Sequence, residues 1–162
     1  MYYSEVFKIL NEANVRYLVV GGVAINLYCH PRSTFDLDIT LALDEQNLLS
    51  AIKAIESLGY KPKLPVRATD FANSEIRKEW REKKNMLVFS FIRDERKFET
   101  IDLLFETPTD FEQYYSKKRT VFRNEISIPV IEISDLIELK KKANRKQDIS
   151  DIEILTEILH RQ

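Results

Sequence analysis

Two aspartates separated by one residue stand inside an apolar, alternating stretch of this chain. Asp36 and Asp38 alternate with a set of large apolar residues, namely Phe35, Leu37, Ile39 and Leu41. Successive side chains of a strand point to opposite faces, so the two carboxylates share the face opposite the apolar set. Neighbouring carboxylates repel each other, and a divalent cation relieves that cost. The pair therefore predicts a site for Mg²⁺, which takes oxygen ligands and leaves positions open for phosphates. An exposed sheet face is the alternative.

A glycine pair precedes the aspartates and offers a second element of phosphate chemistry. Gly21 and Gly22 follow an apolar strand and open a short helical pattern. Backbone N–H groups at such a helix start can approach an anion closely. Arg32 and Thr34 come just before the aspartate strand, where they could reach phosphate oxygens, and arginine suits bidentate phosphate binding. Plain loop roles for both stay open. Together these residues point to phosphoryl or nucleotidyl transfer.

A third carboxylate is expected from a hairpin formed by strands at 86–92 and 98–105. Asp102 alternates with core-facing residues, namely Ile101, Leu103 and Phe105. If its strand neighbours that of the aspartate pair, three carboxylates converge, which suits a site with two metal ions. Glu99 falls on the opposite face, and Glu106 lies beyond the strand end. An exposed strand aspartate is again the alternative.

The residues quoted above resemble a known family of enzymes. A hydrophobic residue before Gly-Gly, followed by Asp36-Leu37-Asp38-Ile39, resembles the hallmark of the nucleotidyltransferases of the DNA polymerase beta superfamily. The fuller motif Arg32-Ser33-Thr34-Phe35-Asp36-Leu37-Asp38 is most similar to the AbiEii-type branch, which includes nucleotidyltransferase toxins. A second similarity to this branch covers residues 133–152. The middle of the chain matches only in its order of elements.

The resemblance implies a metal-dependent transfer of a nucleoside monophosphate from a nucleoside triphosphate, for instance ATP, to a hydroxyl acceptor. Asp36 and Asp38 would hold Mg²⁺ or Mn²⁺, and Asp102 would complete one ion site and help activate the acceptor hydroxyl. Gly21 and Gly22 would cradle the triphosphate. The acceptor stays open between RNA, protein and a small molecule. A non-catalytic nucleotide-binding or toxin–antitoxin interaction module on the same fold is the alternative.

One lysine falls on the apolar face of an expected helix near the C-terminus. Lys140 lies within a stripe formed by Ile133, Leu136, Ile137, Leu139 and Ala143. A lysine there must reach outward, pair with an acid or meet a phosphate. The resemblance implies that Lys140 is a triphosphate contact or a carboxylate partner, whereas structural pairing with an aspartate is the alternative. Asp148 is expected to cap the last helix, with Arg145 as its surface partner.

The elements that position these residues predict one α/β (α+β) domain over 1–162, with a core at about 15–132. It is expected to be a small, mainly antiparallel-to-mixed sheet with helices against it and two C-terminal helices within 133–160. Helices are predicted at 4–13, 45–58, 109–118, 134–145 and 149–160, and further strands at 119–123 and 126–132. Residues 60–68 read as a loop or edge strand, and 70–84 as a solvated helix or mobile segment.

Composition narrows the class of protein. The 162 residues are 44% hydrophobic and 31% charged, as in ordinary globular proteins, and carry a formal net charge of −1. A general nucleic-acid coat would need a basic excess. The single cysteine excludes an intrachain disulfide. No basic secretory leader or membrane-length apolar run is visible, so we expect a cytoplasmic protein without membrane contact.

Overall fold

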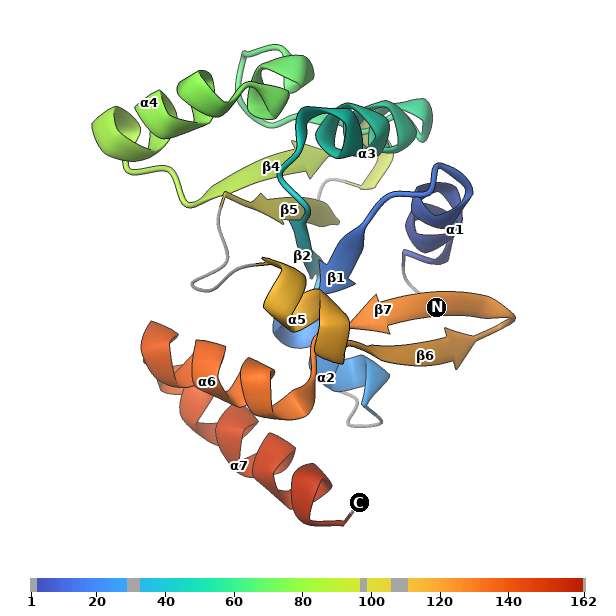
Figure 1. The fold of residues 1–162 in the computed structure, drawn as a ribbon, viewed down its shortest axis with the longest axis vertical. Helices are drawn as coiled ribbons and strands as arrows, with labels where there is room; N and C mark the ends of the chain where they lie inside the picture. Colours follow the sequence, from blue (N-terminus) through green and yellow to red (C-terminus); the bar gives the residue numbers. More distant parts are fainter. Residues whose placement is uncertain (1–2, 29–32, 97–98, 106–110, 162) are drawn as a thin grey trace.

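The computed structural model describes residues 3–28, 33–96, 99–105 and 111–161. Within these residues lies a seven-stranded mixed sheet with the strand order β3-β4-β5-β2-β1-β7-β6 (Figure 1). The strands are β1 (Tyr17–Val19), β2 (Asp36–Leu41), β3 (Lys61–Pro62), β4 (Val88–Ile92), β5 (Thr100–Leu104), β6 (Arg119–Arg123) and β7 (Ile126–Val130). The predicted fold class, a small mixed sheet with flanking helices, is confirmed.

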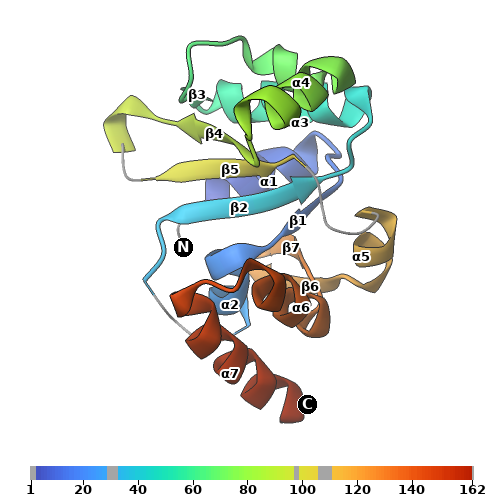
Figure 2. The same cartoon turned by 90° about the vertical axis from the view of Figure 1, so that its left-hand side faces the viewer.

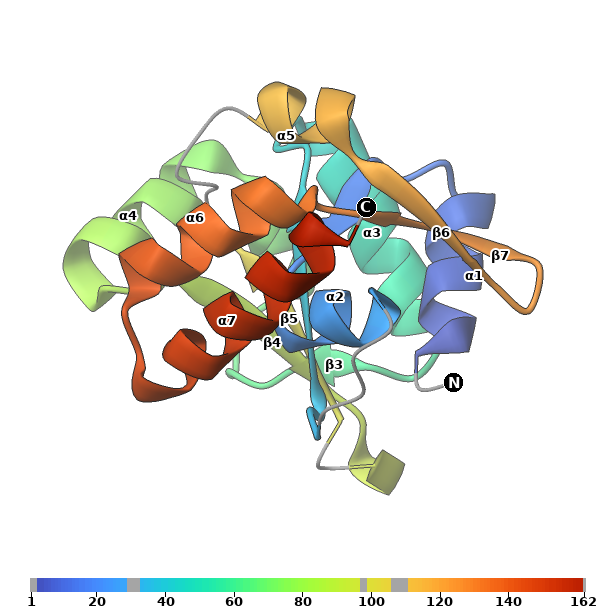
Figure 3. The same ribbon diagram turned by 90° about the horizontal axis from the view of Figure 1, so that it is seen from below.

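Helices cover both sides of this sheet. They are α1 (Ser4–Glu12), α2 (Gly21–Leu27), α3 (Glu45–Ser57), α4 (Ser74–Lys84), α5 (Phe111–Lys117), α6 (Ile133–Ala143) and α7 (Lys146–His160), with 3-10 turns η1 (Ala68–Ala72) and η2 (Asp94–Arg96). Helices α3 and α4 lie on one side of β2, β4 and β5, and α2, α6 and α7 lie on the other (Figures 1 and 2). Seen from the second side, α6 and α7 lie in front of the sheet next to α2 (Figure 3).

The centre of the sheet joins strands that are far apart in the chain. Strands β2 and β5 are parallel neighbours, with Asp38 opposite Asp102 and Asp36 opposite Thr100. On their other edges, β5 pairs with β4 and β2 pairs with β1, and both of these pairs are antiparallel. The sheet is therefore mixed at its centre. The parallel pair of β2 and β5 needs a long crossover connection between the two strands.

The expected alternation of β2 holds for three of the four apolar residues. The prediction is wrong for Phe35, which is 52% exposed just before the strand begins, and Thr40 on the aspartate face is buried. Leu37, Ile39 and Leu41 are buried, whereas Asp36 is exposed and Asp38 is half-buried. Helix α3 begins as predicted after Asp44, whose side chain accepts a hydrogen bond of 2.9 Å from the N–H of Asn47. No helix of the described residues is both long and apolar enough to cross a bilayer.

The charged segment before β4 forms a helix rather than a mobile stretch. Helix α4 is capped by Asn73, whose side chain accepts hydrogen bonds from the first turn. Trp80 turns inward and stacks on Phe89 of β4, with ring centroids 5.5 Å apart and an interplanar angle of 6°. Phe71 of η1 stacks on the same ring at 5.1 Å. A few aromatic contacts thus anchor α4, whose charged residues lie on its outer face.

The last helix begins earlier than the sequence predicts. Helix α7 starts at Lys146 and not at 149, so Asp148 lies in its first turn and is not the N-cap. From there the carboxylate accepts the backbone N–H of Arg145 at 3.0 Å, which still satisfies a donor at the helix start. In the 60–68 segment, β3 is an edge strand of only two residues.

Candidate active site

Three neighbouring strands place a polar row across one face of the sheet. Asp38 on β2 lies opposite Asp102 on β5, which in turn lies opposite Ser90 on β4. The hydroxyl of Ser90 hydrogen-bonds the carboxyl of Asp102. The adjacency of the two aspartate strands, on which the sequence prediction of a joint site depended, is therefore present.

Asp36 lies one pleat further along the same face, at the exposed end of β2. The hydroxyl of Thr100 donates to its Oδ1 at 2.5 Å, and the Tyr3 hydroxyl contacts the carbonyl groups of Phe35 and Thr100. The Thr100 hydrogen bond links Asp36 to β5. Among the residues that the structure describes, no three His, Cys, Asp or Glu side chains converge closely enough to hold an ion. Convergence is thus limited to the pair Asp38 and Asp102.

Gly21 makes room for Asp38. A Cβ atom at Gly21 would lie 2.0 Å from Oδ2 of Asp38, well inside van der Waals contact, and its φ of +64° also favours glycine. The N–H of Val20 donates to the Asp38 carbonyl at 3.0 Å, which fixes the approach of the two segments. The glycine at the start of α2 is required by a carboxylate, and its role as a phosphate cradle stays a prediction. Gly22 is buried within α2.

The row carries more negative charge than its surroundings neutralise. Burial, and then the charges of Asp102 and Asp36, raise the pKa of Asp38 from 3.8 to about 6, although Arg145 and Lys140 oppose the rise. Burial and Asp36 also raise the pKa of Asp102, against the Ser90 hydrogen bond and the charge of Lys63. Oδ1 of Asp102 is buried and accepts no hydrogen bond within the described residues. An oxygen in this state suits a cationic ligand.

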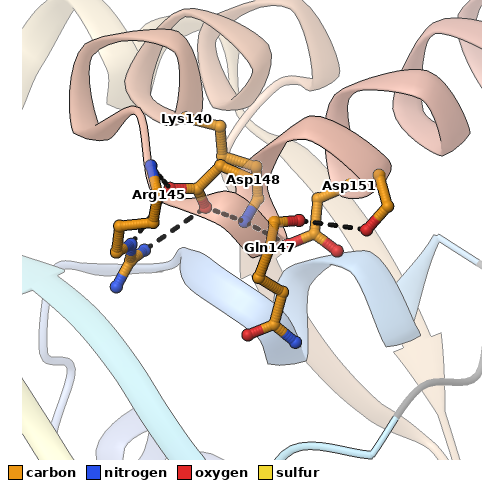
Figure 4. A network of polar contacts seen from close by, with 6 residues as sticks. Lys140, Arg145, Gln147, Asp148 and Asp151 are labelled. Atoms are coloured by element: carbon orange, nitrogen blue, oxygen red, sulfur yellow. Dashed lines mark hydrogen bonds and ion pairs between the residues drawn. The ribbon is translucent and has the colours of Figure 1, made fainter.

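Lys140 lies in a buried ion cluster between α6 and α7. Its Nζ is 2.7 Å from Oδ2 of Asp151 and 3.3 Å from Oδ1 of Asp148 (Figure 4). All three side chains are almost fully buried. The structure thus gives Lys140 the carboxylate partners that the sequence analysis held as one alternative, and a phosphate contact stays a prediction.

Arg145 completes this cluster at its exposed edge. Its Nε donates to Oδ2 of Asp148 at 3.0 Å, so the expected surface partner of Asp148 is present. The side chain points from the α6–α7 connection toward α2 and β2 (Figure 4). The positive group therefore faces the side of the molecule that carries the aspartate row.

The remaining predicted residues lie at the edge of this site. Thr34 is half-buried just before β2, and Arg32 and Glu106 lie outside the described residues. Glu99 is buried on the opposite face of the sheet, as its position in the alternation predicts, and lies 3.8 Å from Arg93.

Sequence reasoning missed Ser90, Lys63 and Asp151. Ser90 had a usable signal, because it is the one polar residue between two buried phenylalanines, Phe89 and Phe91, on the strand expected to pair with that of Asp102. Asp151 is four residues before a buried leucine, Leu155, on α7, which places both on the inner helix face. Lys63 follows a short edge strand and had no periodic signal.

Comparison with known proteins places the fold. No family model matches the chain, and no curated protein matches it. Among solved structures, it is similar to the lincosamide antibiotic adenylyltransferase LnuA with lincomycin bound, at 18% identity, a TM-score of 0.59 and coverage of 94% of this chain and 93% of LnuA. The chain has a nucleotidyltransferase-like fold.

Two further structures agree with this assignment of the nucleotidyltransferase-like fold. The antibiotic-resistance factor ANT(2″)-Ia, solved with adenylyl-2″-tobramycin, is 12% identical with a TM-score of 0.62, over 96% of this chain and 86% of that protein. An antigenic nucleotidyltransferase-like protein from Paracoccidioides brasiliensis is 14% identical with a TM-score of 0.55, over 93% and 75%. At these identities the common feature is the fold.

Proposed function

We propose that this protein transfers a nucleoside monophosphate from a nucleoside triphosphate to a hydroxyl group, in a metal-dependent reaction. The observation that carries the proposal is the in-register pair Asp38 and Asp102 in a nucleotidyltransferase-like fold, in which Oδ1 of Asp102 is buried and accepts no hydrogen bond from the described part of the chain. The motif over residues 32–38 and the similarity over 133–152 support membership of the AbiEii-type branch.

Mg²⁺ or Mn²⁺ fits the donors that this face supplies. Carboxylate oxygens are the hard ligands such ions prefer, and Oδ1 of Asp102 has an unused acceptor position. The raised pKa of Asp38 reflects like charges that a cation would balance. Asp38 and Asp102 would hold the ion, with Asp36 alongside. A bound ion would supply charge neutralisation for the phosphate oxygens.

The reaction needs one bond made and one broken at the α-phosphorus. The acceptor oxygen forms the new bond, the bond to the oxygen bridging the α- and β-phosphates breaks, and pyrophosphate leaves with that electron pair. The hydroxyl proton passes to the carboxylate of Asp102, which would lie beside the ion and the acceptor hydroxyl. Gly21 and Gly22, Arg32, Thr34 and the Lys140 cluster are the candidates for orienting the phosphate chain.

A small molecule with a hydroxyl group is the acceptor class we favour. LnuA is named for a lincosamide antibiotic, and ANT(2″)-Ia was solved with an adenylylated tobramycin, so two proteins of similar fold are associated with such acceptors. The net charge of −1 also gives no general attraction to RNA. RNA and protein acceptors are kept as outcomes of the test.

The test incubates the protein with each α-³²P-labelled nucleoside triphosphate, Mg²⁺ or Mn²⁺, and separate pools of small molecules, total RNA and total protein. We expect label to move into the small-molecule pool with release of pyrophosphate, and no transfer by Asp38→Asn. Transfer of the label to RNA or to protein would show that the acceptor is RNA or protein and not a small molecule. Nucleotide binding without any transfer would favour the non-catalytic module. If the protein shows no nucleotide binding and no transfer, the proposal is wrong.

A further inference from the structure

The connection between α6 and α7 projects one arginine from a fixed position. Asn144 ends α6 in the left-handed conformation, with φ 48°, and Arg145 is extended before α7 begins at Lys146. Two residues therefore connect the two helices. Its side chain leaves the helix pair on the side of α2 and β2 (Figure 4).

Arg145 and Lys140 share Asp148 but differ in access to solvent. The side chain of Lys140 is only 6% exposed and lies between Asp148 and Asp151, whereas that of Arg145 is 73% exposed. Arginine has five N–H donors in a planar fork. The hydrogen bonds to Asp148 use Nε and Nη2, so the two N–H groups of Nη1 take no part in them. Arg145 therefore offers donors at the surface that the buried lysine does not.

The charge of Arg145 acts on the aspartate row. Arg145 is one of two cations that lower the pKa of Asp38 against its burial and its acidic neighbours. In return, the pKa of Arg145 is raised, mainly by its hydrogen bond to Asp148 and in smaller part by Asp38. The guanidinium lies on the side of α2 and of β2, the strand that carries Asp38 (Figure 4).

We propose that Arg145 binds the phosphate chain of the nucleotide, while Lys140, Asp148 and Asp151 form the buried base that holds it. This rests on the proposed function and names a binding residue within it. Asp148 fixes the fork beforehand, so less side-chain entropy is lost when a phosphate binds. Phosphate oxygens next to the metal-binding carboxylates bring the negative charge that an exposed guanidinium pairs with bidentately.

The test compares Arg145→Gln with Arg161→Gln. Arg161 also belongs to the α7 region and is 80% exposed, and within the described residues its one ion pair is with Glu157 at 3.5 Å, so it controls for loss of a surface charge. Dissociation constants are measured by calorimetry for each nucleoside triphosphate and monophosphate with Mg²⁺, and for Mn²⁺ alone. Arg145→Gln should weaken triphosphate binding by about 10- to 100-fold and monophosphate binding less, as expected for lost hydrogen bonds to a charged group.

Binding of Mn²⁺ alone by Arg145→Gln should be unchanged or tighter, because a positive charge near Asp38 has been removed. Arg145→Lys, which keeps the charge without the fork, should recover part of the triphosphate affinity, and thermal melts verify that all variants fold. Equal triphosphate affinity in Arg145→Gln and wild type, or equal losses for triphosphate, monophosphate and Mn²⁺, would overturn the assignment and leave the proposed function standing. If the wild-type protein binds no nucleotide, both the role of Arg145 and the proposed function are wrong.

Discussion

Two acidic clusters of this molecule use the same residue type in opposite ways. On the sheet face, Asp38 and Asp102 lie side by side with few cations to balance them, and the pKa of Asp38 is raised to about 6. Between α6 and α7, the side chain of Asp148 is 2% exposed, and burial alone would raise its pKa. Hydrogen bonds from Arg145 and Lys140 outweigh burial there, so the pKa of Asp148 is lowered.

The two clusters differ in whether their negative charges are balanced by nearby cations. A buried carboxylate with matched donors is stable in its ionised form, and the cluster needs nothing further. Carboxylates that repel each other cost folding free energy until a cation arrives. A cost of this kind, retained on one face of an otherwise well-packed sheet, is typical of a binding site.

Breaking the matched cluster should give the largest effect. Lys140→Met keeps the apolar stem but leaves Asp148 and Asp151 buried without their shared cation, so we expect a loss of about 3–5 kcal/mol in the free energy of unfolding. Urea denaturation measures this loss. Lys141→Met is the control, because Lys141 forms an exposed pair with Glu138, and it should change stability by less than about 0.5 kcal/mol. Equal effects of the two substitutions would contradict the role of the buried cluster.

Relieving the unmatched cluster should act with the opposite sign. Because the pKa of folded Asp38 lies above 3.8, the folded protein binds an extra proton between about pH 4 and 6, and this group's contribution to stability falls as pH rises through that window. Asp38→Asn should therefore be about 2–3 kcal/mol more stable than wild type above pH 6 without metal, and no more stable below pH 4.

Urea denaturation of Asp38→Asn and wild type at pH 4, 5, 6 and 7.5 measures this difference directly. Carboxylates elsewhere titrate in both proteins and cancel in the comparison. A stability difference that does not change with pH would contradict the raised pKa. Addition of Mg²⁺ should stabilise wild type and not the variant, which links the cost to the proposed ion.

The fit between α2 and the aspartate row can be tested with two glycines. Both Gly21 and Gly59 have positive φ, of 64° and 83°, so alanine at either should cost about 1 kcal/mol in backbone strain. Only at Gly21 does the new Cβ meet Asp38, since at Gly59 the nearest atom is 3.8 Å away. Gly21→Ala should cost roughly 1–2 kcal/mol more than Gly59→Ala by thermal or urea denaturation. It should also abolish nucleotide transfer, whereas Gly59→Ala should retain it.

The smallest expected effect concerns the hydroxyl group beside Asp102. Ser90→Ala removes a hydrogen bond that lowers the pKa of Asp102, so that pKa should rise further and stability should change by about 1 kcal/mol. The acid limb of the pH–rate profile for nucleotide transfer should move to higher pH. Ser116→Ala on exposed α5 is the control and should leave the profile in place. If the pH–rate profile of Ser90→Ala matches that of wild type, Ser90 does not act on the site.

Regular periodicity accounts for what the sequence could predict. The alternation around Asp36 and Asp38 defined the faces of β2, and the Asp44 cap defined the start of α3. The face of Asp102 followed from the same rule. These features are local, because each depends on residues within a single strand or turn.

The features that escaped prediction depend on contacts between distant elements. Lys63 acts on Asp102 from beside a two-residue edge strand, which has no periodic pattern to read. Gly21 reads as an anion site by its position before a helix, whereas the structure requires it to accommodate a carboxylate from β2. The burial of the Lys140 cluster depends on how α7 packs against α6, and the pattern of a single helix does not specify this packing.

The parallel pairing of β2 with β5 also determines when the proposed site can form. Asp36 and Thr100, which face each other in this pairing, are 64 residues apart in the chain, and α3, α4 and β4 are formed by the residues between them. Joining such distant strands is the slow kind of contact in folding. During synthesis, a ribosome-bound chain that has not yet released β5 contains no paired carboxylates. The proposed site therefore forms late, and we expect fragments that end before β5 to lack it.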